Sequence, residues 1–143
     1  MTNQEITAKI SQLFNYNINK EGTTCKELAA RKKLNYKSIN AYANGSRTPR
    51  LRNYIVIYSM FADNLTRREA EKVATKTINS FLDEIAILFS KGYRYADFEQ
   101  ITGIPDAIFY KYRKKLVKDV SLSHAIIIIK CFNLNFKIPG LID

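Results

Sequence analysis

Cationic and amide side chains gather in one stretch of the chain, residues 24–61. Its single acid is Glu27, and its bases are Lys26, Arg31, Lys32, Lys33, Lys37, Arg47, Arg50 and Arg52. Guanidinium and ammonium groups bind phosphate oxygens, whereas Asn side chains can pair with base edges. The residue types of this stretch therefore indicate recognition of a nucleic acid.

Two short helices and a turn would position these side chains. Thr24 and Glu27 have the spacing of a capping box, in which a hydroxyl and a carboxylate bind free backbone N–H groups at a helix start. We expect this helix to continue to about Lys32, and a turn to follow at residues 33–35. A second helix is then expected over residues 36–43.

The loop after residue 43 and the helix beyond it carry further signals. Asn44–Gly45 ends the second helix, because both residue types tolerate a left-handed backbone. Thr48–Pro49 is expected to begin the next helix, with Pro in the first turn, where its missing N–H costs nothing. One face of that helix is apolar and should be buried: Leu51, Ile55, Tyr58 and Phe61.

The spacing of Ala29, Leu34 and Ile39 resembles that of the Cro/repressor-type helix-turn-helix family of phage and plasmid regulators. The Asn-Gly-x-Arg-x-Pro pattern at residues 44–49 recurs in the same family. Lys33 departs from the family, which favours Gly there, at a small cost in backbone energy. The resemblance implies that the second helix lies in the major groove of DNA, with its N-terminal part at the base edges.

Two sets of DNA contacts follow from this resemblance. Side chains expected at base edges or flanking phosphates are Asn35, Tyr36, Lys37, Asn40 and Ala41. Side chains expected on phosphates are Thr24, Lys26, Asn44, Arg47, Arg50 and Arg52. Lys37 would donate to guanine and Asn40 would pair with adenine. Two alternatives stay open: Asn35 acts only as a helix cap, and residues 31–33 form a solvated basic face.

A weaker copy of the pattern recurs about seventy residues later. Phe98, Gly103, Ile104 and Phe109 occupy the matching places, but Glu99 replaces a small residue and the Asn-Gly-x-Arg-x-Pro loop is missing. Candidate DNA contacts in this copy are Lys111, Arg113, Lys114, Lys115 and Lys118. The alternative is a degenerate copy that serves as a dimerisation or partner surface.

The remaining segments predict an all-α fold. We expect a first helix from Thr2 to Phe14, followed by a loop over residues 15–22. An amphipathic run over 66–91 is either one bridging helix or two, and short helices are expected over 96–102, 105–116 and 123–132. The sequence thus predicts two helix-turn-helix bundles in tandem, joined by an amphipathic helix, with domains at residues 1–65 and 66–143. Taken alone, Ile126–Ile129 would also fit a buried strand.

Several function classes lack their residues. His124 has no neighbouring Cys, Asp or Glu at catalytic or metal-ligand spacing, so we expect no enzyme activity, no metal and no cofactor. Cys25 and Cys131 are expected to be buried thiols, and Tyr36 and Tyr42 to be exposed among otherwise buried aromatic residues. The chain has no apolar run near the roughly 20 residues of a membrane span, and no signal peptide is evident. We therefore expect a cytoplasmic protein that does not bind membranes.

Charge completes the sequence-based hypothesis. Lys and Arg outnumber Asp and Glu by 23 to 13, which gives a net charge of +10 and favours a polyanionic partner. The leading prediction is sequence-specific binding of double-stranded DNA by a transcriptional regulator, such as a repressor, of a phage, plasmid or other mobile element. Two units per chain would serve a monomer on a pseudo-palindromic site or a homodimer on a longer one. The alternatives are an accessory factor for replication, partition or excision, and a protein-interaction or inhibitor module.

Overall fold

The computed structural model describes residues 1–143 and is all-helical, as predicted. Its only β-type pairing is one isolated bridge between Ile138 and Ile142. The helices are α1 (Asn3–Lys20), α2 (Cys25–Arg31), α3 (Tyr36–Ala43), α4 (Leu51–Ala62), α5 (Arg67–Ser90), α6 (Tyr95–Thr102), α7 (Asp106–Arg113) and α8 (Leu122–Cys131).

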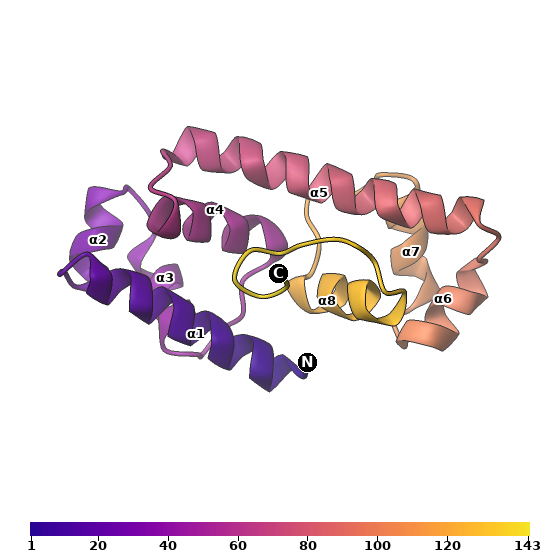
Figure 1. Ribbon diagram of the computed structural model, residues 1–143, viewed down its shortest axis with the longest axis horizontal. Coiled ribbons are helices and arrows are strands. Elements are labelled where there is room, and N and C mark those ends of the chain that lie inside the picture. Colours follow the sequence, from indigo (N-terminus) through magenta and orange to yellow (C-terminus); the bar gives the residue numbers. More distant parts are fainter.

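Helix α5 runs along the length of the molecule (Figure 1). Helices α1 to α4 lie at one end of it, and α6 to α8 lie at the other. Within this frame α5 packs against both α4 and α7, and α4 also touches α8. The amphipathic run is thus one continuous bridging helix, opened by a full capping box between Thr66 and Glu69.

The two halves share the positions of their left-handed turns. Lys33 has φ 56°, and Gly103, seventy positions later, has φ 76°. Gly45 has φ 78°, and its counterpart Lys115 has φ 54°. L-residues rarely adopt this conformation, yet it recurs at two positions of each half with a spacing of seventy residues.

The start of α4 is capped by a residue of the other half. No side chain of α4's own N-terminal turn caps it. Instead, Asp119 Oδ1 accepts from the backbone N–H of Arg52 at 3.0 Å, and the Val120 carbonyl accepts from the N–H of Leu51 at 3.0 Å. These bonds satisfy two free donors at a helix N-terminus, where a carboxylate is also favoured by the helix dipole.

The segment after α8 also joins the two halves. It crosses between α4 and α8 (Figure 1), and its residues Ile138 and Leu141 are buried. The Tyr54 hydroxyl of α4 donates to the Pro139 carbonyl, and the Phe136 ring lies 5.6 Å from that of Phe81 on α5. The core is accordingly continuous through both halves.

Three predicted boundaries were wrong. The first helix continues through the expected loop at residues 15–22 as far as Lys20, because Ile18 packs into the core and outweighs the low helix propensity of the Asn-rich segment. Helix α4 begins at Leu51 rather than at Thr48–Pro49, since Arg50 is still extended, with ψ 165°. Helix α7 ends at Arg113 rather than Leu116, because Lys115 turns left-handed.

Two predictions about burial were also wrong. Tyr42 is only 4% exposed, because it packs on the inner face of α3 with its ring 6.3 Å from that of Phe14. Cys131 is exposed at the end of α8, where its thiol donates to the Ile101 carbonyl of α6 at 3.8 Å, and Cys25 is half-buried. Among the other aromatic residues expected in the core, Phe61, Phe81 and Phe109 are buried, but Tyr58 is only half-buried. Three more aromatic residues are exposed: Tyr16, Tyr93 and Tyr110.

Candidate nucleic-acid interface

Close packing of α2 and α3 fixes the direction in which α3 points. Ala29 and Ile39 are buried to 0% and 1% exposure, so the small residue lets the two helices approach. The left-handed Lys33 reverses the chain between them, and the Leu34 N–H donates to the Ala29 carbonyl at 2.8 Å. A bulkier residue at position 29 would push α3 away from α2.

Side-chain caps define where each of these helices begins. Thr24 Oγ1 accepts from the Glu27 N–H at 3.2 Å, although Glu27 itself binds the Thr23 hydroxyl rather than completing the expected box. Asn35 Oδ1 accepts from the Ser38 N–H at 3.0 Å. Asn35 therefore caps α3, and its amide NH₂ stays available as a donor.

One face of α3 is turned to solvent. Ile39, Tyr42 and Ala43 point into the core. The outer positions follow helical spacing and are partly or fully exposed: Tyr36, Lys37, Asn40, Ala41 and the cap Asn44. This face carries an ammonium, an amide and a phenol but no carboxylate, and Lys37 forms no ion pair.

The loop after α3 brings an arginine back to the helix. Asn44 Oδ1 accepts from the backbone and the hydroxyl of Ser46, which folds the loop. Arg47 Nη2 then donates to the Ser38 hydroxyl at 2.9 Å, and its guanidinium lies 5.2 Å from the centroid of the Tyr42 ring. Arg47 is exposed and has no carboxylate partner, so its charge remains available to an anion.

The other two arginines of the predicted phosphate set point elsewhere. Arg52 is 26% exposed at its side chain, where it meets Glu71 at 3.4 Å and the Thr75 hydroxyl at 3.0 Å. Arg50 Nε lies 3.6 Å from Asp119. Both therefore belong to the junction between the halves, and the structure does not bring them to the exposed face of α3. Thr24 and Lys26 lie exposed at the start of α2.

Helix α7 of the second half presents a different surface. Phe109 and Tyr112 are buried, as their counterparts in α3 are, and burial raises the pKa of Tyr112 to about 12. Lys111 and Lys114 are exposed and unpaired. Two other predicted contacts interact within the protein: Lys115 pairs with Asp83 at 3.0 Å, and Arg113 packs on aromatic rings. Lys118 lies in the loop beyond α7.

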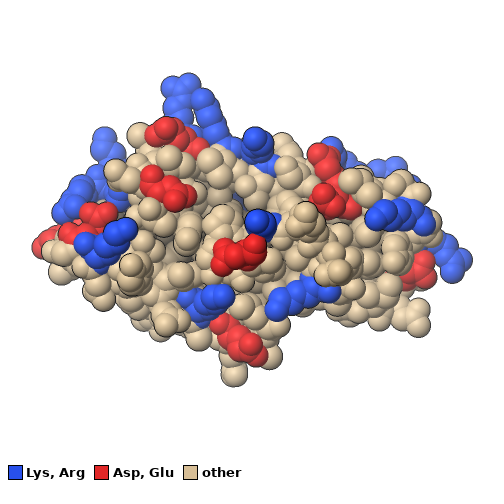
Figure 2. All heavy atoms as spheres, in the orientation of Figure 1, with Lys and Arg blue, Asp and Glu red and all other residues tan.

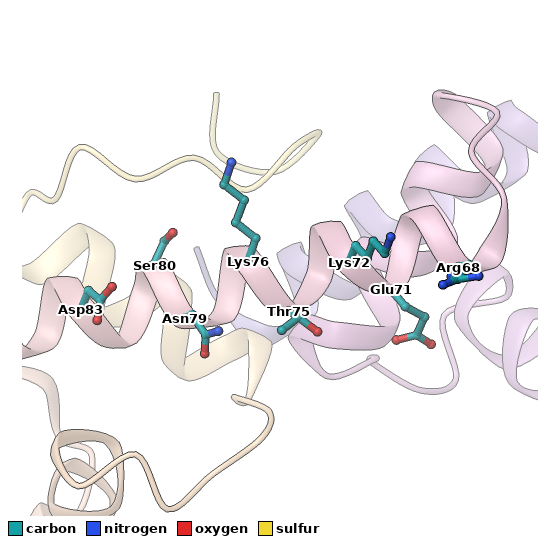
Figure 3. A pocket seen from close by; sticks show the side chains of 8 residues that line it. All are labelled: Arg68, Glu71, Lys72, Thr75, Lys76, Asn79, Ser80 and Asp83. Carbon is teal, nitrogen blue, oxygen red and sulfur yellow. The ribbon is translucent and has the colours of Figure 1, made fainter.

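An open groove of about 580 Å³ follows the outer side of α5 (Figure 3), a feature that sequence reasoning missed. Its lining is entirely polar: Arg68, Glu71, Lys72, Thr75, Lys76, Asn79, Ser80 and Asp83. Its two acids are neutralised by Arg52 and Lys115, whereas its lysines form no ion pair. Small-molecule sites are mostly apolar and enclosed, so this groove does not fit one.

The side chains that could hold a metal ion lie apart from one another. No group of three or more His, Cys, Asp or Glu residues is placed to hold a metal ion. The half-buried His124 has its pKa lowered by burial and by Arg50, and burial raises the pKa of the Cys25 thiol. Lys and Arg side chains are spread over the face in Figure 2, with acids between them, so net charge alone marks no site there.

No family model, no curated protein and no solved structure matches the chain. The resemblance of residues 24–61 to the Cro/repressor family thus remains a prediction from the sequence. No helix is both long and apolar enough to cross a membrane.

Proposed function

We propose that this protein binds double-stranded DNA in a sequence-dependent manner through α3 and regulates transcription in a phage, plasmid or other mobile element. The observation that carries the proposal is the outer face of α3. There, Lys37 and Asn40 share a surface with Arg47, whose guanidinium is held by Ser38, and this surface has no acidic side chain.

The dimensions of α3 suit the major groove. A helix with its side chains is about 10–12 Å across and the major groove of B-DNA is about 12 Å wide, so an eight-residue helix such as α3 can lie in the groove. Both ends of α3 are capped, by Asn35 at the start and by Asn44 at the end. The outer side chains therefore project from a rigid element. Lys37 would donate to guanine O6 or N7, and Asn40 would bind adenine through its amide.

Arg47 has a different role in this proposal. Its bond to Ser38 and its position over Tyr42 hold the guanidinium beside the first turn of α3. There it would bind a phosphate as α3 enters the groove, together with Lys26 and Thr24 at the start of α2. Contacts of this kind set register and affinity but read no base.

The fixed arrangement of the two halves would determine the length of the DNA site. Helix α5, the Asp119 cap and the segment after α8 tie the two halves together. If both halves engage DNA, the half-sites would be separated by about 10 bp or a multiple of it. If only α3 does, a homodimer would be needed to cover a palindrome.

Two substitutions and one control test the proposal. In equilibrium binding to a duplex selected from a random library, Asn40→Ala should reduce the preference for the selected sequence about 5- to 100-fold. Arg47→Ala should instead weaken selected and random duplexes alike and lower the salt slope by about 0.9. Lys91→Ala, which removes an exposed charge at the C-cap of α5, is the matched control and should change neither the sequence preference nor the salt slope.

An affinity for duplex DNA that does not change with salt would contradict the proposal, because binding through several phosphate contacts must weaken steeply between 50 and 200 mM salt. A protein-interaction module with this fold would show that behaviour instead.

A further inference from the structure

A ladder of aromatic rings and one cation lies on the surface where α5, α6 and α7 meet. The Phe89 and Tyr95 rings are 5.0 Å apart, and Tyr95 lies 6.2 Å from Tyr110. The Arg113 guanidinium sits 4.5 Å from the centroid of Phe89 and 5.6 Å from that of Tyr95. We refer to Phe89, Tyr95, Tyr110 and Arg113 as the α7 stack.

The outermost ring of the α7 stack is open to solvent. Tyr110 is 49% exposed, and its contact with Tyr95 is tilted by 47°, so Tyr95 does not cover the Tyr110 ring face to face. Arg113 donates to the Tyr95 hydroxyl at 3.5 Å. Arg113 thereby holds Tyr95 in place, and Tyr110 is left as a supported but uncovered platform.

The repeat shows that the shared fold does not require this stack. Tyr110 corresponds to Asn40 of the first half, and Arg113 corresponds to Ala43. The buried anchor Phe109 corresponds to Ile39 and keeps its inward position. An amide on the outer face of α3 is thus replaced on α7 by an exposed aromatic ring backed by a cation.

The chemistry of α7 also differs from what a duplex reader needs. Asp106 and Ala107 stand where α3 has Tyr36 and Lys37, so the first turn of α7 has an acid and no base. A carboxylate there repels phosphate at the position where α3 would approach DNA. The exposed, unpaired lysines come at the other end: Lys111 lies in the last turn of α7, and Lys114 is its C-cap.

We propose that the α7 stack binds an unpaired nucleobase of single-stranded nucleic acid. The base stacks on Tyr110, while Lys114, one turn along the same face, and Lys111 bind the neighbouring phosphates. Stacking tolerates any base, because every base has a π face, so little sequence preference is expected. This site is separate from α3 and does not depend on duplex binding by the first half.

Both DNA and RNA strands offer this chemistry, and two probes distinguish them. Labelled oligo(dT) and oligo(rU) of twelve nucleotides, which do not self-pair, are titrated with the full chain and followed by fluorescence anisotropy. Tyr110→Ala should weaken binding about 5- to 100-fold, whereas Tyr110→Phe, which keeps the ring, should bind like the original. Tyr16→Ala removes another exposed ring, 65% exposed on α1, and should have no effect.

Two further measurements guard against misleading results. Circular dichroism checks that the Tyr110 variants are folded, and a 5-iodouracil oligonucleotide should photo-crosslink to the peptide that contains Tyr110. Equal affinity of Tyr110→Ala and Tyr110→Phe, crosslinks confined to another segment, or no oligonucleotide binding at 50 mM salt would each overturn the proposal. Lys37→Ala should alter only duplex binding, so failure at α3 and failure at α7 are distinguishable.

Discussion

Asp119 is a cap supplied to α4 by the other half of the chain, and its loss should destabilise the whole fold. Removing a helix cap costs about 1 kcal/mol, within a range of about 0.5–2. The ion pair with Arg50, whose side chain is 60% exposed, adds at most about 1 kcal/mol after solvent screening. Asp119→Ala should therefore lower the free energy of unfolding by about 1–2 kcal/mol.

Urea denaturation followed by circular dichroism measures this loss. With a slope of about 2 kcal/mol/M, the midpoint should fall by about 0.5–1 M. Asp119→Asn keeps an acceptor for the Arg52 N–H and should lose roughly half as much, through the missing charge alone. The matched control is Asp83→Ala, whose carboxylate pairs with Lys115 at an exposed position and should shift the midpoint little.

If Asp119→Ala unfolds at the same urea concentration as Asp83→Ala, the cap does not stabilise the protein. The contact between the halves at the start of α4 would then contribute nothing measurable to the free energy of unfolding.

Three further changes test other features of the fold. Lys33→Gly should raise the free energy of unfolding by about 0.5–1 kcal/mol. Gly removes the strain of the left-handed backbone at φ 56°, but part of this gain is offset because Gly loses more chain entropy on folding. A lower melting temperature would contradict this. Gly140→Ala should destabilise by about 2 kcal/mol or more, since at φ 80° its Cβ would lie 2.9 Å from the Tyr54 hydroxyl; unchanged thermal unfolding would rule out that crowding. The pKa of His124 is lowered by burial, so the folded state binds its proton less readily than the unfolded chain does, and stability should fall as the pH drops below about 6.5. His124→Gln should flatten that part of the pH profile, and an unchanged profile would remove His124 as its source.

Local patterns in the sequence were sufficient for the elements of the first unit. Ala29 and Ile39 lie where the predicted packing needs them, and Lys33 is left-handed at the place where Gly was favoured. Capping spacing and turn residues act over three or four positions, so they can be read directly from the sequence.

Long-range contacts explain what the sequence could not predict. Arg52 looked like a phosphate ligand, but its side chain binds Glu71, Thr75 and the carbonyl of Lys118. Its partners Thr75 and Lys118 are far away in the chain, so no local sequence pattern predicts these contacts. In the same way, Asp119 could not be recognised as the cap of a helix that begins at Leu51.

The alternation of buried and exposed positions within α3 could have corrected one error. Ile39, Tyr42 and Ala43 lie three and four residues apart and share the inner face, so helical spacing alone places Tyr42 inside. The exposure of Tyr110 was equally readable, because it follows the buried Phe109 and precedes the buried Tyr112 by two positions.

Selection from a random duplex library, followed by titration of Asn40→Ala and Arg47→Ala, tests duplex reading by α3 most directly. We expect an enriched motif, a loss of preference for that motif in Asn40→Ala, and a uniform loss of affinity in Arg47→Ala. An unenriched library, or two variants that bind every duplex as the original protein does, would show that α3 does not read DNA.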